Sequence, residues 1–159
     1  VADALRCLAS VPAPAGLTLG LAGSGPARHR LFKDAKAPLL FTSKLALRNY
    51  MNKALEWIPA RCRPAKMNFS DDKIISTQSD MDKSHFFLDE NGKSCIIDFD
   101  AVALLPESFA SHTMHSHLFG REAVKYLDWS RSPNAYSMAR AGAVVIMNSS
   151  RTLGTLVSI

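Results

Sequence analysis

The sequence has few cysteines and no long hydrophobic run, and each of these features argues against a class of protein. Cys7, Cys62 and Cys95 lie far apart without C-x-x-C spacing, which argues against a disulfide framework or a zinc site. The longest apolar run, residues 141–147, is much shorter than the roughly 20 residues that a membrane-spanning helix needs. The first residues also lack a secretory signal pattern. We therefore expect a cytoplasmic protein with no membrane partner.

The composition is that of one globular domain, because 47% of the 159 residues are hydrophobic and 21% are charged. The formal net charge of +5 is unevenly distributed, with +8 in residues 1–70 and −3 in residues 71–159. A basic half attracts nucleic acid or other anions, but no aromatic-interleaved basic segment or known binding module is present. We expect no nucleic-acid partner and keep an anion binder as the weakest alternative.

Residues 1–41 predict a loop-rich lead-in, in which a short helix precedes a Pro- and Gly-rich stretch. Gly20, Gly23 and Gly25 invite comparison with a phosphate-binding loop, because glycines let backbone amides approach phosphate closely. Arg28 occupies the position of the third glycine of G-x-G-x-x-G, however, and no strand precedes the stretch. We therefore interpret it as a plain loop.

Apolar residues at three- and four-residue spacing predict a helix over residues 42–58. Ser43 or Thr42 can cap its start, and Pro59 stops it. Further helices are expected over residues 107–116, 120–127 and 133–147. Pro133 suits the first turn of the last one, where its missing amide hydrogen costs little.

Three short runs predict strands, at residues 74–77, 86–88 and 95–99. The last two flank the segment 89–92, Asp-Glu-Asn-Gly, in which Asn-Gly readily adopts the positive φ angles of a tight turn. These runs predict a hairpin whose second strand ends at Asp98.

Polar residues around this hairpin suit phosphoryl transfer. Asp80 lies in the polar loop before the hairpin, His85 follows five positions later, and Asp98 comes at the end of an apolar strand. Phosphoryl transfer needs one carboxylate to orient the attacking hydroxyl and others to hold magnesium against the phosphates. A loop carboxylate and a strand-end carboxylate fixed by one hairpin have that arrangement.

The segment 77–100, TQSDMDKSHFFLDENGKSCIIDFD, resembles the catalytic region of the aminoglycoside and choline phosphotransferase family, which has a kinase fold. That family has a loop H-G-D-x-x-x-x-N before a hairpin that ends in I-I-D-F/W. Here residues 78–80, Gln-Ser-Asp, replace His-Gly-Asp, and residues 96–99 match the second motif. The T-Q-S-D-M-D version, with ARHRLFKD at 27–34 and LLPESFASHTM at 104–114, is most similar to fungal members.

The resemblance implies an α+β, mainly α-helical fold, namely a protein-kinase-like C-terminal lobe with a small β-hairpin at the active-site region. Residues 1–41 would be the lead-in, and residues 42–159 the helices and catalytic-loop hairpin of a single domain 1–159. The family's N-terminal lobe carries an ATP-covering hairpin and a phosphate-pairing lysine. We find no such strand set before Ala35, so we expect the lobe to be missing and the lobe-facing surface to promote self-association.

By the same resemblance, Asp80 corresponds to the catalytic carboxylate and Asp98 to a magnesium ligand, with Mg²⁺ and ATP as cofactors. The substrate would be a small-molecule hydroxyl. His85 replaces the asparagine that serves as the other metal ligand in the family, and imidazole nitrogen is a poorer ligand for magnesium than oxygen. An enzyme of this kind would be incomplete or impaired in this chain.

Whether the chain is an enzyme stays open, because a non-catalytic, pseudokinase-like binding module would keep the same packing. Two neighbouring acids, Asp82 and Asp100, are interpreted as solvated or structural. His112, His115 and His117 do not share one helix face at spacings of three and five, so we interpret them as helix-surface histidines rather than metal ligands.

Overall fold

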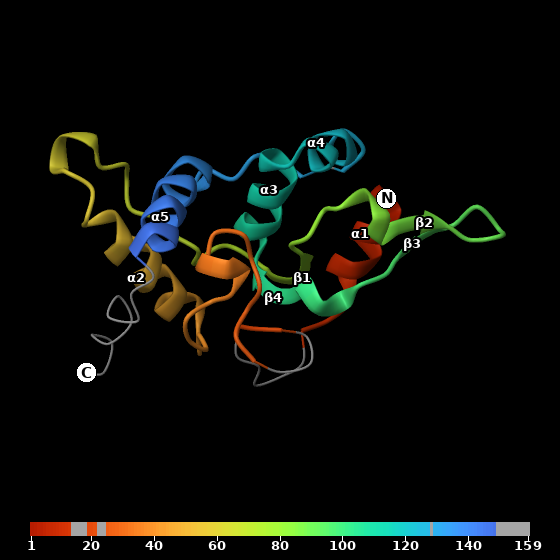
Figure 1. Cartoon of the computed structure of the whole chain (residues 1–159), viewed down its shortest axis with the longest axis horizontal. Coiled ribbons are helices and arrows are strands. Elements are labelled where there is room, and N and C mark those ends of the chain that lie inside the picture. The colour runs from red at the N-terminus through yellow and green to blue at the C-terminus, as the bar shows by residue number, and fades with distance from the viewer. Residues whose placement is uncertain (14–18, 22–24, 128, 149–159) are drawn as a thin grey trace.

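The computed structural model describes residues 1–13, 19–21, 25–127 and 129–148. These residues form five α-helices and two antiparallel strand pairs (Figure 1), which confirms the α+β expectation. The helices are α1 (Ala2–Ser10), α2 (Lys44–Leu55), α3 (Glu107–Ser116), α4 (Leu118–Val124) and α5 (Ala135–Asn148). The strands are β1 (Ile74–Gln78), β2 (Phe86–Leu88), β3 (Ser94–Ile96) and β4 (Val102–Pro106). None of the helices in the described ranges has the length and apolar character required to cross a membrane.

The two strand pairs are nested in the sequence. Strand β1 pairs with β4, so that Gln78 lies opposite Val102, and the intervening β2 and β3 pair with Phe86 opposite Ile96. The connecting segments 79–85 and 97–101 therefore leave neighbouring strand ends and run beside each other. Two backbone bonds join these segments, from Ser79 N to the Ala101 oxygen (3.2 Å) and from Ile97 N to the His85 oxygen (2.9 Å).

The predicted strands agree with β1 and β2, but the prediction for the third strand was wrong at its end. Strand β3 stops at Ile96 because Asp98 has a left-handed backbone with φ 59°, which breaks the extended conformation. Residues 99–101 then form a short 3-10 turn. The sequence analysis also missed β4, whose five residues are all buried and therefore show no alternation of polar and apolar positions.

The predicted helices are present with shifted ends. Ser43 caps α2 as expected, because its side-chain oxygen accepts a bond from Ala46 N at 3.1 Å. The expected helix over 107–116 is α3, whereas the one over 120–127 begins earlier, as α4 at Leu118. Pro133 lies just before α5 instead of in its first turn, which corrects the prediction.

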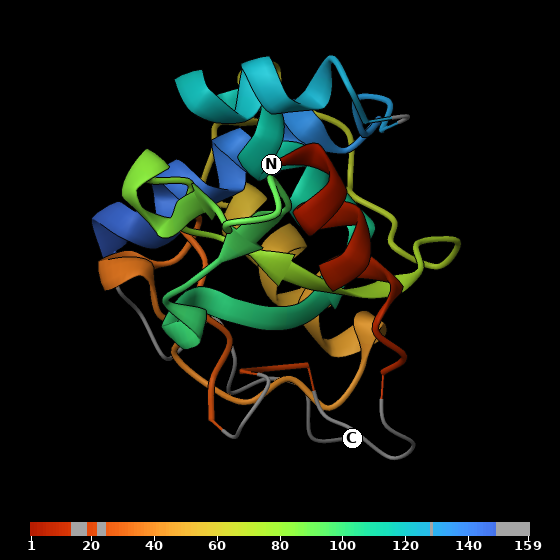
Figure 2. The ribbon, with the colours of Figure 1, turned by 90° about the vertical axis from the view of Figure 1, so that its right-hand side faces the viewer.

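Two hydrophobic clusters hold the described part of the chain together, and α3 contributes to both. The larger cluster joins α2 and α5 to residues of the lead-in, and Phe109 of α3 belongs to it. The smaller one joins α1 to α4 and to Met114 near the end of α3, and it includes Met81 of the segment 79–85. Figure 2 shows α1 beside β1, with which it is in contact.

The described residues of the lead-in pack against the core more extensively than their composition predicts. Leu31, Phe32 and Phe41 are buried in the larger cluster, and isolated bridges pair residues of the segment with one another. The glycines serve a close backbone turn, because a Cβ atom on Gly20 would overlap the carbonyl oxygen of Gly25. Gly23, the remaining glycine of the rejected phosphate loop, lies outside the described residues.

Candidate functional site

The nested strands bring Asp80, His85 and Asp98 together, as their order in the sequence predicts. His85 lies between the two acids, with Nδ1 at 3.9 Å from Oδ2 of Asp80 and Nε2 at 3.4 Å from Oδ2 of Asp98. The imidazole is 16% exposed, whereas the carboxylates are 55% and 50% exposed. The site is therefore a pair of accessible carboxylates on either side of a largely buried ring.

Gln78, which the sequence analysis treated only as a substitution in the family motif, fixes the spacing of the two acids. It is 1% exposed at the end of β1. Its Nε2 donates to the carbonyl oxygen of Asp98 at 3.1 Å, and its Oε1 accepts from Asp80 N at 3.3 Å. This buried amide, whose nitrogen and oxygen both form hydrogen bonds, ties the segments 79–85 and 97–101 together. The signal in the sequence was a glutamine that directly follows the predicted strand 74–77, two positions before Asp80.

The backbone of Asp98 is in the left-handed region, with φ 59° and ψ 73°. Aspartate tolerates this conformation better than most residues, because its short side chain bonds to the local backbone. Here the carboxylate accepts a long bond from Asp100 N at 3.4 Å. Unusual backbone of this kind is often found at functional sites, and it turns the chain sharply after β3.

Consecutive side-chain turns order the segment that carries Asp80. Oδ1 of Asp80 accepts from Asp82 N at 3.1 Å, and Asp82 in turn accepts from the backbone and hydroxyl of Ser84 at 2.8 and 2.7 Å. These bonds from Ser84 hold the pKa of Asp82 below its usual value. Asp82 is therefore a structural residue of the loop, as expected. Asp100 is exposed and lies 4.0 Å from Arg28, which agrees with a solvated role.

One nitrogen of the His85 imidazole makes no hydrogen bond to the described residues in this arrangement. Its Nδ1 is buried and has no hydrogen-bond partner among the described residues, since 3.9 Å to Asp80 is too long for a bond. An unpaired buried nitrogen is uncommon and costs free energy. Nδ1 can therefore form a further hydrogen bond, but only after a shift of the carboxylates or of the ring.

The side chains at this site match those of a magnesium site only in part. Within the described ranges, no three His, Cys, Asp or Glu side chains are grouped so as to hold a metal ion. Magnesium, however, is commonly held by one or two carboxylates together with phosphate oxygens and water. The exposed carboxylate of Asp98 suits that role, and Asp80 lies on the other side of the ring. The nitrogen of His85 is the poorer donor for this cation.

One expectation about the other histidines was wrong. His112 is buried, at 9% exposure, instead of lying on the helix surface, and the T-shaped and tilted contacts of His29 place it beside this helix. Burial, with Arg30, Arg131 and His115 adding charge nearby, lowers the pKa of His112 to about 4. Sequence spacing alone missed this because α3 is buried along nearly its whole length, on more than one face.

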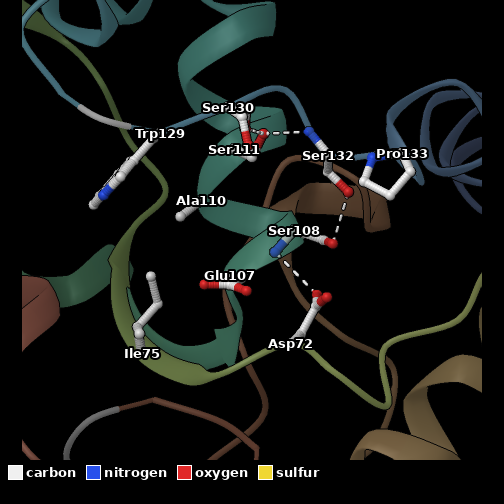
Figure 3. A pocket seen from close by; sticks show the side chains of 10 residues that line it. All are labelled: Asp72, Ile75, Glu107, Ser108, Ala110, Ser111, Trp129, Ser130, Ser132 and Pro133. Atoms are coloured by element: carbon white, nitrogen blue, oxygen red, sulfur yellow. Dashed lines mark hydrogen bonds between the residues drawn. The ribbon is translucent and has the colours of Figure 1, made fainter.

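A separate cavity of about 200 Å³ lies at the other end of β1, between Asp72 and the loop that precedes α5 (Figure 3). Most of its polar groups form hydrogen bonds with one another. Asp72 accepts from Ser108 N at 3.1 Å, and the Ser108 and Ser132 hydroxyls are 2.7 Å apart. Ser111 accepts from Ser132 N at 2.9 Å. The cavity wall is therefore a network that fixes the start of α3 to the 129–134 loop.

No protein-family model, curated protein or solved structure matches this chain significantly. The phosphotransferase interpretation therefore rests on the sequence motifs alone.

Proposed function

We propose that this chain carries the carboxylate part of an ATP-dependent phosphotransferase centre that acts on a small-molecule hydroxyl. The observation that supports this most is the convergence of Asp80 and Asp98 on the two sides of His85, with Gln78 tying their loops together. The kinase-like lobe, the nucleotide and the fungal relationship belong to the same proposal. They come from the motif resemblance described above.

Asp80 is the residue that would orient the acceptor hydroxyl. Its side chain is 55% exposed, and one carboxylate oxygen is held by the amide of Asp82 while the other stays available. In the proposed reaction the hydroxyl oxygen bonds to the terminal phosphorus of ATP, the bond to ADP breaks, and the hydroxyl proton passes to Asp80. Positioning of this kind accounts for much of the catalysis in phosphoryl transfer.

Asp98 is the residue that would hold magnesium. When bound, the ion would supply neutralisation of the phosphate charge. The left-handed backbone of Asp98 and its bond to Gln78 fix where this carboxylate lies. His85 would remain beside it as a neighbour of both acids, and its role as a metal ligand stays a prediction.

A non-catalytic binding module is the second candidate, and the position of His85 favours it. The ring nitrogen is only 3.4 Å from Asp98, so it occupies the side of the carboxylate that faces Asp80. A chain that binds a nucleotide or a partner without turnover would tolerate this contact. An enzyme would require the ring to share the space with a metal and phosphate.

The test is phosphoryl transfer from radiolabelled ATP, in magnesium, to a panel of small hydroxyl compounds. Asp80→Asn is the variant, and Asp71→Asn, an exposed acid outside the site, is the matched control. The enzyme proposal predicts transfer by the chain and by the control, with a fall of at least about a hundredfold in Asp80→Asn. No transfer to any compound, or equal transfer by Asp80→Asn, would contradict catalysis and leave the binding module.

A further inference from the structure

A second cavity, of about 440 Å³, lies in the basic half of the chain, away from the acidic site. It is lined by residues of the segment 26–38, of α2 and of α5, and the short turn 33–35 lies beside α5 (Figure 1). Its lining residues are Pro26, Lys33, Asp34, Lys36, Ala37, Pro38, Tyr50 and Val145. None of them belongs to the Asp80, His85 and Asp98 site.

The cavity has an apolar, buried side and a charged mouth. Ala37, Tyr50 and Val145 are each 2% exposed and form the buried side. Lys33 and Lys36 are exposed at the mouth, where the only acidic lining residue is Asp34. The charge at the mouth is thus positive, in keeping with the excess of basic residues in the first half of the sequence.

Tyr50 is the residue that points to a ligand. Its ring packs against Phe32 and Phe41 in the larger core cluster, with centroid distances of 6.4 and 5.3 Å. No hydrogen bond joins its hydroxyl to another described residue, and this oxygen is not one of their buried unpaired atoms, so it faces the open space of the cavity. A phenol hydroxyl in this position can donate a hydrogen bond to a ligand or to a water molecule in the cavity.

The backbone at the mouth has an unusual conformation. Asp34 and Ala35 both have φ 52°, and neither is a glycine. This conformation is costly for alanine in particular. The turn is held by bonds from Ala35 N to the Phe32 oxygen (3.1 Å) and from Lys36 N to the Lys33 oxygen (3.0 Å). It places both lysines on one side, at the same opening.

We propose that this cavity binds a small organic anion, a carboxylate or phosphate monoester with an apolar body. Lys33 and Lys36 hold the charged group at the mouth, and the hydroxyl of Tyr50 bonds to a polar atom of the ligand at the buried side. Burial raises the pKa of Tyr50 to about 12, so the phenol keeps its proton and can donate at neutral pH. Charge-assisted bonds from two lysines favour a phosphate or carboxylate over a neutral group.

The experiment is a calorimetric titration of the chain with phenyl phosphate, with benzoate as a second anion and benzylamine as a cation of similar shape. Lys33→Gln/Lys36→Gln removes the charge at the mouth. Lys66→Gln/Lys73→Gln removes the same charge from exposed positions elsewhere. Tyr50→Phe keeps the packed ring and removes only the hydroxyl. Equal melting temperatures of Tyr50→Phe and the parent chain verify that the core is intact.

The proposal predicts that one or both anions bind at least tenfold more tightly than benzylamine. Binding weakens by about tenfold or more in Lys33→Gln/Lys36→Gln, stays within twofold in the Lys66→Gln/Lys73→Gln control, and weakens by about fivefold in Tyr50→Phe. Absence of saturable anion binding, equal binding of benzylamine, or unchanged binding in the Lys33→Gln/Lys36→Gln variant would overturn it. Unchanged anion binding in Tyr50→Phe would show that water satisfies the hydroxyl and would overturn the proposed contact at the buried side.

Discussion

The Nε2 atom of His85 lies 3.4 Å from Oδ2 of Asp98, so the residue that ends the loop after β1 touches the acid that follows β3. His85 and Asp98 are 13 positions apart in the sequence, and the nested strand pairs bring them together. The contact places a ring nitrogen where the proposed magnesium site would need an oxygen. It makes the function of His85 directly testable.

Replacement of this histidine by an amide should strengthen metal-dependent nucleotide binding. In His85→Asn the side chain offers an oxygen, which magnesium prefers, and it removes the ring from between Asp80 and Asp98. We expect the affinity for Mg-ATP to rise severalfold, measured by calorimetry. His85→Ala, which opens the same space without supplying an oxygen, is the control. Equal or weaker binding in His85→Asn than in His85→Ala would argue that no magnesium binds here.

The left-handed backbone of Asp98 predicts an order of stability among substitutions. Asparagine tolerates this conformation, whereas alanine pays roughly 1–2 kcal/mol for it. Asp98→Ala should therefore lower the free energy of unfolding by about 1 kcal/mol relative to Asp98→Asn, measured by urea denaturation. Equal stability of the two variants would show that the φ of 59° is not maintained in solution.

Asp72 caps α3 from outside the helix. The residue before α3, Pro106, has no side-chain cap, and the carboxylate of Asp72 accepts from Ser108 N in the first turn. We expect Asp72→Ala to lower the free energy of unfolding by about 1 kcal/mol. Asp71→Ala, at the neighbouring exposed position, should change it by much less. A similar loss in both variants would contradict the capping role.

Two buried histidines predict that stability falls in mild acid. Burial is the main cause that lowers the pKa of His29 to about 3 and that of His112 to about 4. The unfolded chain, with a histidine pKa near 6.5, therefore takes up protons first as the pH falls. Stability is fully present above pH 6.5 and is lost below it, by up to about 1.4 kcal/mol per pH unit for each histidine.

The hydrogen bonds of His29 show which nitrogen of the neutral ring carries the proton. Nδ1 accepts from Leu31 N at 3.2 Å, while Nε2 lies 2.9 Å from the hydroxyl of Thr113 and 3.2 Å from the carbonyl oxygen of Phe109. The proton is therefore on Nε2, and a second proton on Nδ1 would oppose the amide of Leu31. Denaturation between pH 7.5 and 5.5 should give a shallower slope in His29→Gln than in the parent chain. The same slope in both would contradict this assignment.

The self-association expected from the sequence stays a prediction, and exposed apolar side chains give it a location. Phe87 and Leu88 of β2, with Ile97 and Phe99 after β3, are each 47% or more exposed close to the candidate site. We expect sedimentation velocity to show a concentration-dependent increase in mass, reduced in Leu88→Lys. A monomeric profile at high protein concentration would contradict the prediction.

The sequence predicted the elements whose patterns are local. The spacing of apolar residues predicted α2, and Asn-Gly predicted the β2–β3 hairpin. The sequence analysis missed β4, because a strand buried on both faces shows no alternation of polar and apolar residues. It also placed His112 on the surface, because the burial of α3 depends on neighbours distant in sequence. The order of Asp80, His85 and Asp98 predicted their convergence. The role of Gln78 depends on two loops meeting in space and was not visible in the motif.

The most direct test of the proposed phosphate and metal site is calorimetric titration with ATP, in the presence and absence of magnesium. The Lys33→Gln/Lys36→Gln background is used so that the anion cavity does not contribute. The account predicts saturable, magnesium-dependent binding that Asp98→Asn weakens at least tenfold and Asp71→Asn leaves unchanged. No magnesium-dependent binding, or equal binding in Asp98→Asn, would contradict the assignment of Asp98 and, with it, the phosphotransferase proposal.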